Sequence, residues 1–432
     1  MKLKKRVLSL IVSAGLIFTS AMPAYTVAAA EPPGNAGFSD YITVSGTKLM
    51  DGENELRFVS LNYPQATSDT PWEHANAMKT FRAMGGNVTR TYTIPVFNGQ
   101  NSATAYVTGV DSEGNLTFNE DALNMLDDVL AKANQYGIRV IVPFVDHWHW
   151  IGGMDGYVWL AGESDGKAPS QSGFQDWAWR FYSSEKCMDL FKQMITHLLN
   201  RTNSVTGVMY KDDPAILCWE TGNEIGNRSQ VERDEELSAW TNEVVAHVKS
   251  IDSNHLVLDG RMSMSPMSLS SDNLADILGA HYYEGNYAQR CEDDTRDAHN
   301  AGKPFILGEF GAKVTAQPCI DVFQKGIEND TNGIMMWSLR AHKDGFGYYF
   351  HNEDGYWASY HWPGFESGNY YGETEIIRSI YAYAQIVNGK ASSYEEAKNI
   401  PIPAPEAEEA PLLYSETGTP HDSSFAGGSA IT

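Results

Sequence analysis

Residues 216–224 read Ile-Leu-Cys-Trp-Glu-Thr-Gly-Asn-Glu, a short apolar run that passes directly into polar residues. A second run, Phe-Ile-Leu-Gly-Glu at residues 305–309, also ends in a glutamate. Short unbroken apolar runs are typical of parallel strands that are covered on both faces. We therefore expect a parallel sheet that carries carboxylates at the carboxyl ends of two of its strands.

Runs of this kind recur eight times and alternate with stretches of helical periodicity. Eight such units favour an α/β fold in which the sheet closes into a (β/α)8 TIM barrel. An open, doubly wound sheet is the alternative, but no glycine-rich phosphate-binding loop follows an early strand. The predicted strands cover residues 58–62, 87–91, 139–145, 216–220, 256–259, 278–282, 305–309 and 333–339. The predicted helices cover residues 120–136, 185–201, 237–251, 287–301, 320–329 and 373–388.

The two ends of the chain differ from this pattern. Residues 1–30 combine a basic start, an apolar run and a closing Ala-Ala-Ala, which is typical of a Sec-type signal peptide. We therefore expect a secreted, extracellular protein whose barrel domain spans residues 31–395. Residues 396–432 begin rich in proline and glutamate and predict a linker with a disordered tail. Within the barrel domain, residues 42–58 predict a short N-terminal β-hairpin, and residues 340–371 form a long insert after strand eight.

The composition argues against several kinds of partner. The 432 residues carry 31 Lys and Arg against 55 Asp and Glu, a net charge of −24. Such an acidic chain is a poor match for nucleic acid or an anionic membrane. Cys218 lies in an apolar run and is predicted to be buried, whereas a disulfide between Cys291 and Cys319 stays an open possibility. No Cys or His pair has the spacing of a zinc site, so we expect neither a metal nor another cofactor.

Catalytic side chains of such barrels lie at the carboxyl ends of the strands, where the βα loops meet. Asn223 and Glu224 follow the fourth run, and Glu309 ends the seventh. Carboxylates that follow apolar residues are costly to bury unpaired. Two of them facing each other across a barrel mouth indicate acid/base and nucleophilic catalysis, the combination that cleaves a glycosidic bond. The other strand-end candidates are Arg90, Asp146, His147, Trp148, His281, Tyr283 and Trp337.

These motifs resemble those of a known family. From about residue 38 to residue 389 the chain is similar to glycoside hydrolase family 5, and within it to the β-mannanases. Residues 219–224, Trp-Glu-Thr-Gly-Asn-Glu, match the Trp-Glu-x-x-Asn-Glu signature of that group. Residues 198–214 are similar to the segment that leads into its fourth strand, and His147-Trp148 followed by Gly-Gly-Met at 152–154 is similar to its third loop.

Two departures from the mannanase pattern lie beside the expected site. Ile225 and Gly226 stand where the family has Pro and mannanases then have Arg, and His147 stands where Asn is expected. Because these changes lie beside the expected site and leave both glutamates in place, they bear on the substrate more than on the type of catalysis.

The resemblance implies a retaining glycosidase in which Glu224 is the general acid and base and Glu309 is the nucleophile. It also implies that Asn223 bonds the 2-hydroxyl of the sugar. From the residues themselves, we expect partial burial and the charge of Glu309 to raise the pKa of Glu224. We expect Arg90 to keep the nucleophile ionised by charge pairing.

The remaining candidates are expected to orient these groups or to bind sugar. The Tyr283 hydroxyl would donate to the nucleophile or toward the sugar ring oxygen, and His281 would orient the acid/base. Aromatic rings offer flat apolar platforms to pyranose faces, so we expect Trp337 to bind the sugar at the cleavage site and Trp148 to line an outer subsite. His147, beside Trp148, is expected to contact substrate.

The favoured function is therefore a secreted, monomeric, retaining endo-β-1,4-mannanase that acts on plant-type β-mannan or glucomannan. The same machinery also fits a β-glucanase or cellulase, or an exo-acting hydrolase of manno-oligosaccharides. A catalytically inactive carbohydrate-binding barrel is the alternative from another class. That alternative predicts that replacing either Glu224 or Glu309 with glutamine changes nothing.

Overall fold

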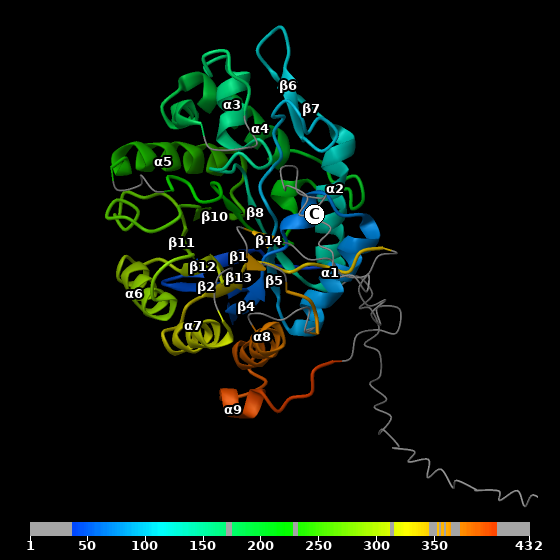
Figure 1. The fold of residues 1–432 in the computed structure, drawn as a ribbon, viewed down its shortest axis with the longest axis vertical. Helices are drawn as coiled ribbons and strands as arrows, with labels where there is room; N and C mark the ends of the chain where they lie inside the picture. The colour runs from blue at the N-terminus through cyan, green and yellow to red at the C-terminus, as the bar shows by residue number, and fades with distance from the viewer. Residues whose placement is uncertain are drawn as a thin grey trace, which may run out of the picture. The chain divides into compact units, whose positions relative to one another are not determined.

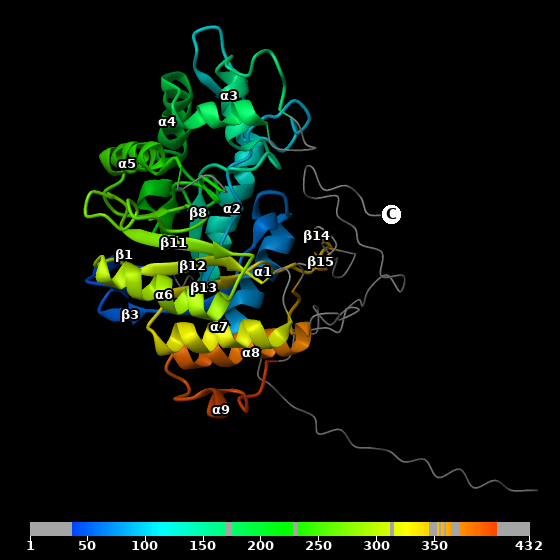
Figure 2. The same ribbon diagram turned by 60° about the vertical axis from the view of Figure 1, so that its left-hand side comes forward.

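The structure is a computed structural model that describes residues 37–169, 175–227, 232–311, 315–344, 352–353, 356–357, 360–363 and 372–403. Eight strands form one sheet in the order β4-β13-β12-β11-β10-β9-β8-β5, and the neighbouring strands pair in parallel. The edge strands β4 (Phe58–Leu61) and β5 (Val88–Arg90) meet through a parallel bridge between Asn62 and Arg90. The sheet therefore curls into a barrel with helices outside it (Figures 1 and 2), which confirms the predicted (β/α)8 fold.

The elements otherwise follow the predicted order closely. The remaining barrel strands are β8 (Arg139–Pro143), β9 (Ile216–Glu220), β10 (Leu256–Asp259), β11 (Ile277–Tyr282), β12 (Phe305–Phe310) and β13 (Gly333–Met336). The helices are α1 (Pro71–Met84), α2 (Glu120–Tyr136), α3 (Gly153–Leu160), α4 (Glu185–Leu199), α5 (Asp234–Ile251), α6 (Tyr287–Asn300), α7 (Ala316–Glu328), α8 (Glu373–Val387) and α9 (Tyr394–Ala397). Short 3-10 helices lie at Pro64–Thr67, Asp176–Tyr182 and Tyr210–Asp212. Two small hairpins are β6 (Val107–Val110) with β7 (Leu116–Phe118), and β14 (Asn352–Glu353) with β15 (Tyr356–Trp357).

The N-terminal element is larger than the predicted hairpin. It is a three-stranded antiparallel sheet of β1 (Ile42–Ser45), β2 (Lys48–Asp51) and β3 (Asn54–Leu56). A second tight turn at Gly52, whose φ of +59° suits glycine, brings β3 back along β2. Leu49 and Leu56 of this sheet belong to the apolar cluster inside the barrel. The small sheet therefore covers the end of the barrel that lies opposite the carboxyl ends of the strands.

Several elements were absent from the sequence prediction. They include the hairpins of β6 with β7 and of β14 with β15, and helices α1, α3 and α9. The start of α1 carries a clear signal, because Thr70 and Glu73 form a reciprocal capping box around Pro71. Helix α1 contains many small and polar residues, so its apolar periodicity is weak. For this reason the capping box alone did not lead to a predicted helix.

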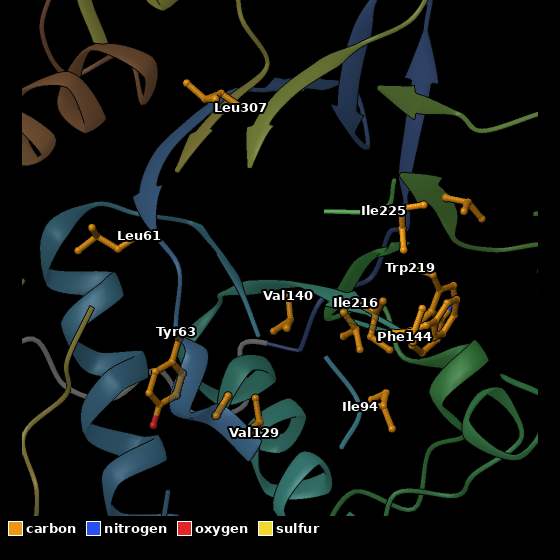
Figure 3. Close-up of a cluster of buried hydrophobic side chains, with 14 of the residues drawn as sticks. Leu61, Tyr63, Ile94, Val129, Val140, Phe144, Ile216, Trp219, Ile225 and Leu307 are labelled. Atoms are coloured by element: carbon orange, nitrogen blue, oxygen red, sulfur yellow. The ribbon is translucent and has the colours of Figure 1, made fainter. Parts of the chain in front are cut away.

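Apolar side chains on the two faces of the sheet form separate parts of the core. Ile216 and Trp219 of β9 face the helices, whereas Leu217 and Cys218 of the same strand lie in the cluster inside the barrel. Figure 3 shows the outer layer, in which the rings of Phe144 and Trp219 stack with centroids 5.4 Å apart. Packing on both faces is why these strands read as unbroken apolar runs.

The four cysteines are all buried free thiols. The predicted burial of Cys218 is confirmed, and the possible bond between Cys291 and Cys319 is not formed. Burial raises the pKa of the Cys187 and Cys291 thiols to about 11, so both stay protonated at neutral pH.

Some predictions fall on parts of the chain outside the described residues. These are the signal peptide at residues 1–30, the tail from residue 404 onward and most of the insert at residues 340–371. The described chain continues past residue 395, where the Tyr381 hydroxyl donates to the Pro401 carbonyl at 3.0 Å. Among the described helices, none combines the length and the apolar character that a membrane span requires.

Asp127 on α2 anchors the segment that leads into β9. Its buried carboxylate accepts hydrogen bonds from the Arg201 guanidinium at 2.7 and 2.9 Å, from the Tyr210 hydroxyl at 2.6 Å and from the Ser204 N–H at 3.0 Å. Burial opposes ionisation, but these donors outweigh it and hold the pKa of Asp127 below its usual range. A depressed pKa means that this carboxylate contributes stability above the ordinary aspartate pKa, and that the contribution is lost as the pH falls through the lowered value.

We expect Asp127→Asn to lower the free energy of unfolding by about 2 kcal/mol near neutral pH, because buried donors lose a charged acceptor. Urea unfolding at a series of pH values measures this difference, which should shrink as acid protonates the wild-type carboxylate. Asp189→Asn, at an exposed position of α4, is the control and should change stability by less than about 0.5 kcal/mol. A difference that stays constant down to strongly acidic pH would contradict the role given to Asp127.

Candidate active site

Two glutamates meet at the carboxyl ends of strands β9 and β12. Glu224 follows β9 and is 4% exposed, and Glu309 lies in β12 and is 3% exposed. One carboxyl oxygen of each, together with a ring nitrogen of His281, lies within 4.8 Å of the others. Residues far apart in the sequence are thus brought to one point, as a closed parallel barrel requires.

The backbone after β9 is shaped to present Glu224. Glu224 has a φ of +54°, in the left-handed region that non-glycine residues rarely adopt and that clusters at functional sites. A Cβ at Gly260 would lie 1.7 Å from the Gly222 carbonyl oxygen, so the ends of β9 and β10 approach closely only without that atom. The Ile225 N–H donates to the Gly260 carbonyl at 3.0 Å, a bond that proline could not make. The departure from the family pattern at Ile225 therefore has a structural use.

Glu309 is held by two strong donors. Its Oε1 accepts from the Arg90 guanidinium at 2.7 Å, and its Oε2 accepts from the Tyr283 hydroxyl at 2.6 Å. Arg90 is fully buried and also donates twice to Glu220, at 2.6 and 3.0 Å. Burial would lower the pKa of Arg90, but Glu220 and Glu309 raise it above the ordinary value. Arg90 is therefore a permanent cation beside Glu309, as the sequence suggested.

Donors to Glu224 differ in charge from those to Glu309. The Trp148 indole N–H donates to Glu224 Oε2 at 2.6 Å, and His281 Nδ1 lies 3.1 Å from Oε1. Burial lowers the pKa of His281, so its ring is neutral near pH 7. A cation therefore contacts Glu309, whereas Glu224 contacts an indole and an imidazole, and this difference in charge favours the ionised form of Glu309 over that of Glu224.

The pKa of Glu309 reflects opposing effects. Burial raises it most, and the Glu224 carboxyl raises it further. A charged His281 ring, Arg90 and the Tyr283 hydrogen bond each lower it. The net effect is a pKa above the usual range for glutamate.

Asn223 links Arg90 to the loop after β8. Its Oδ1 accepts from Arg90 at 2.9 Å, and its Nδ2 donates to Asp146 at 3.0 Å. Asp146 also accepts from the Tyr92 hydroxyl at 2.6 Å. Neither Tyr92 nor Glu220 was selected from the sequence. Glu220 is the last residue of β9 and follows the apolar Trp219. A charged residue at that position was the signal that could have identified it.

His147 belongs to a second network, which includes Tyr182. Its Nδ1 is 3.2 Å from the Tyr182 hydroxyl, which accepts from the Gly226 N–H at 3.3 Å. The two departures from the mannanase pattern, at His147 and at Gly226, are therefore joined through Tyr182. The His147 ring also meets the edge of Trp148 at a centroid distance of 5.3 Å.

Aromatic rings flank the carboxyl pair. Trp337, at the end of β13, packs with Tyr92 at a centroid distance of 5.8 Å, and Tyr283 lies against the same cluster. Trp148 is half-buried and Trp150 is 38% exposed, with their centroids 6.5 Å apart. Trp337 reaches the two glutamates through Tyr92 and Tyr283.

Within the described residues, one group of side chains has the spacing of a metal site, and it is Glu224, His281 and Glu309 themselves. These atoms already contact Trp148, Arg90 and Tyr283. A cation at Arg90 and hydrogen bonds at both carboxylates are the donor set of an acid/base and nucleophile pair. We therefore interpret Glu224, His281 and Glu309 as part of a site for acid/base and nucleophilic catalysis and not as a metal site.

The molecule is a (β/α)8 barrel with paired glutamates at the ends of its fourth and seventh strands. This arrangement is that of a barrel glycosidase. Residues 40–275 match the family described as "GH family 5 beta-mannosidase-like". This match spans more than half of the 432 residues, and the chain belongs to that glycoside hydrolase family.

Individual relatives agree with this family. The chain is 28% identical over 268 residues to mannan endo-1,4-beta-mannosidase 1 of Solanum lycopersicum, covering 52% of this chain and 66% of the relative. It is 31% identical over 236 residues to mannan endo-1,4-beta-mannosidase 1 of Oryza sativa subsp. japonica, covering 46% of this chain and 52% of the relative. The match thus spans between half and two thirds of these relatives. The crystal structure of an endo-1,4-beta-mannanase from Rhizomucor miehei has the same fold, with a TM-score of 0.66, 22% identity and coverage of 81% of this chain and 100% of that one.

Proposed function

We propose that this chain is a retaining glycoside hydrolase that cleaves internal β-1,4-mannosidic bonds of mannan or glucomannan by double displacement. The observation that carries the proposal is the carboxyl pair, whose nearest ligand oxygens lie within 4.8 Å. A separation of about 5 Å favours direct attack by one carboxylate, whereas inversion needs about 6.5–9.5 Å to admit a water. Family membership and the mannan endo-1,4-beta-mannosidase names of the plant relatives support mannan as the substrate.

In the first step Glu309 attacks the anomeric carbon and forms a bond to it. The bond from that carbon to the leaving oxygen breaks, and Glu224 transfers its proton to this oxygen. Arg90 and Tyr283 orient the attacking carboxylate through their bonds to its two oxygens. In the second step Glu224 takes a proton from water, the water oxygen bonds the anomeric carbon, and Glu309 leaves. Two inversions give net retention.

A polysaccharide panel tests this proposal. We expect mannan and glucomannan to yield manno-oligosaccharides of mixed length, with much slower release from cellulose and mixed-linkage β-glucan. Proton NMR at early times should show the β-anomer before mutarotation. Failure on every mannan would contradict the substrate, release of one short product from chain ends would contradict internal cleavage, and early α-anomer would contradict retention.

We also propose that the protein is exported, because residues 1–30 have the composition of a signal peptide. Expression of the full chain in a secreting host should place the protein in the medium. N-terminal sequencing is expected to begin at Glu31, after the Ala-Ala-Ala motif. Protein that stays in the cells and begins at Met1 would contradict export.

A further inference from the structure

Asp146 lies beside the carboxyl pair without belonging to it. It follows β8, is fully buried, and forms a parallel bridge with Asn223. Its carboxylate accepts from the Tyr92 hydroxyl at 2.6 Å, from Asn223 Nδ2 at 3.0 Å and from the Trp148 N–H at 3.1 Å. All three partners donate, and a carboxylate is the side chain that offers acceptors alone.

Trp148 connects this contact to the reaction. Its indole N–H donates to Glu224 Oε2 at 2.6 Å, and its ring is half-buried. Packing therefore restrains only part of the ring, and its position depends on the main chain that carries it. The Asp146 side chain holds this main chain, because its carboxylate accepts from the Trp148 N–H. The Asp146 carbonyl accepts from the Met154 N–H at 2.8 Å, a bond that substitution of the side chain leaves in place.

We propose that Asp146 is a positioning residue that acts through Trp148 on Glu224, so that its loss impairs proton donation to the leaving group more than nucleophilic attack. The inference rests on the retaining mechanism proposed above. A displacement of about 1 Å at a catalytic group can cost about 10²-fold in rate. A second route runs from Asp146 through Asn223 to the sugar, but it would slow good and poor leaving groups alike. Dependence on the leaving group therefore isolates the route through Trp148.

The charge of Asp146 has a second, independent effect, on the pKa of Glu224, which a pH profile can detect. Burial raises the pKa of Asp146 to about 7, against the pull of its three donors, so it is ionised above that pH. Asp146 and Glu224 interact electrostatically, and a nearby negative charge disfavours deprotonation of Glu224. Other charged or titratable groups that interact with Glu224 include Tyr92, His281 and Glu309. Arg90, Glu220 and Tyr283 adjoin Glu309 or one another.

Two substrates test the role of Asp146. Mannopentaose has a sugar leaving group that needs a proton, whereas 2,4-dinitrophenyl β-mannotrioside releases a phenolate that does not. We expect Asp146→Ala to lower kcat/KM on mannopentaose by about 10²-fold and on the dinitrophenyl substrate by less than about 5-fold. Asp146→Asn keeps an acceptor for Trp148, so it should lose less than the alanine variant on mannopentaose. Its basic limb should also move to lower pH, because the negative charge is gone.

Asp213→Asn is the matched control. Asp213 is another buried aspartate that accepts hydrogen bonds, from Asn134 Nδ2 at 2.8 Å and from the Ala215 N–H at 3.0 Å, but it precedes β9, at the opposite end of the strand from Glu224. Its substitution should leave the ratio of the two rates unchanged. Equal losses on both substrates in Asp146→Ala would overturn the proposal. Should that variant fail to fold, an unmoved basic limb in Asp146→Asn would overturn it instead. Wild-type protein that hydrolyses neither substrate would contradict the proposed function itself.

Discussion

Glu309→Ala is expected to lower kcat/KM on mannan by on the order of 10⁴-fold, because no other group can attack the anomeric carbon. The fold should survive, since alanine removes one of the two carboxylates that face Arg90 and leaves Glu220 in contact with it. Initial-rate kinetics on mannopentaose measure the loss, and thermal unfolding checks the fold. Glu328→Ala, at an exposed position of α7, is the control and should keep wild-type rates.

Azide separates this loss from a general disturbance of the site. In Glu309→Ala, azide fills the space of the missing carboxylate and displaces dinitrophenolate from the dinitrophenyl substrate in one step. The single inversion yields an α-mannosyl azide. Formation of the β-azide, or no effect of azide while Glu224→Ala responds to it, would contradict the assignment of Glu309 as nucleophile.

The acid limb of the wild-type profile should also belong to Glu309. Because burial raises its pKa, protonation begins above the ordinary glutamate value of about 4.3. Activity is therefore expected to fall as the pH drops through this raised value, since a protonated carboxyl cannot attack. A pH profile of kcat/KM that stays flat well below the ordinary value would contradict this.

Glu224→Ala is expected to show a loss that depends strongly on the leaving group. On mannopentaose, kcat/KM should fall by about 10³-fold, the scale of a missing general acid. On the dinitrophenyl substrate the first step should be nearly unaffected, so a burst of phenolate precedes slow turnover. The burst arises because the glycosyl-enzyme forms but no base activates the water that would release it. Stopped-flow absorbance measures both phases.

Azide again provides the stereochemical check for Glu224. It needs no general base, so it should accelerate release of the glycosyl-enzyme in Glu224→Ala and yield the β-mannosyl azide. The anomeric configuration of this product is opposite to that expected for Glu309→Ala. Equal losses on both substrates, without a burst, would contradict the acid/base role of Glu224.

The barrel could be predicted because each strand has a recognisable local sequence pattern. Strands such as β9 are buried on both faces, so their apolar runs are unbroken and their polar ends stand out. The third strand of the N-terminal sheet and helix α1 escaped prediction for the opposite reason. Their sequences carry turn and capping signals in Gly52 and Thr70 but few apolar residues in register.

The site divides in the same way. Glu224, Glu309 and Arg90 were selected because a charged side chain at the end of an apolar strand is conspicuous. Tyr92 and Glu220 were missed, and so was the contact between His147 and the Tyr182 hydroxyl. Hydrogen-bond partners of this kind come from neighbouring strands and loops, and no local pattern marks them.

The sequence by itself determined the order of strands and helices and the residue types at the strand ends, because periodicity and burial act along a single element. Only the tertiary structure decided which oxygen of each glutamate faces which donor, and that Arg90 bridges Glu220 and Glu309. Barrel closure joins β5, β9 and β12 through space, and the protonation of a carboxyl pair depends on distances and burial that arise only when those strands meet.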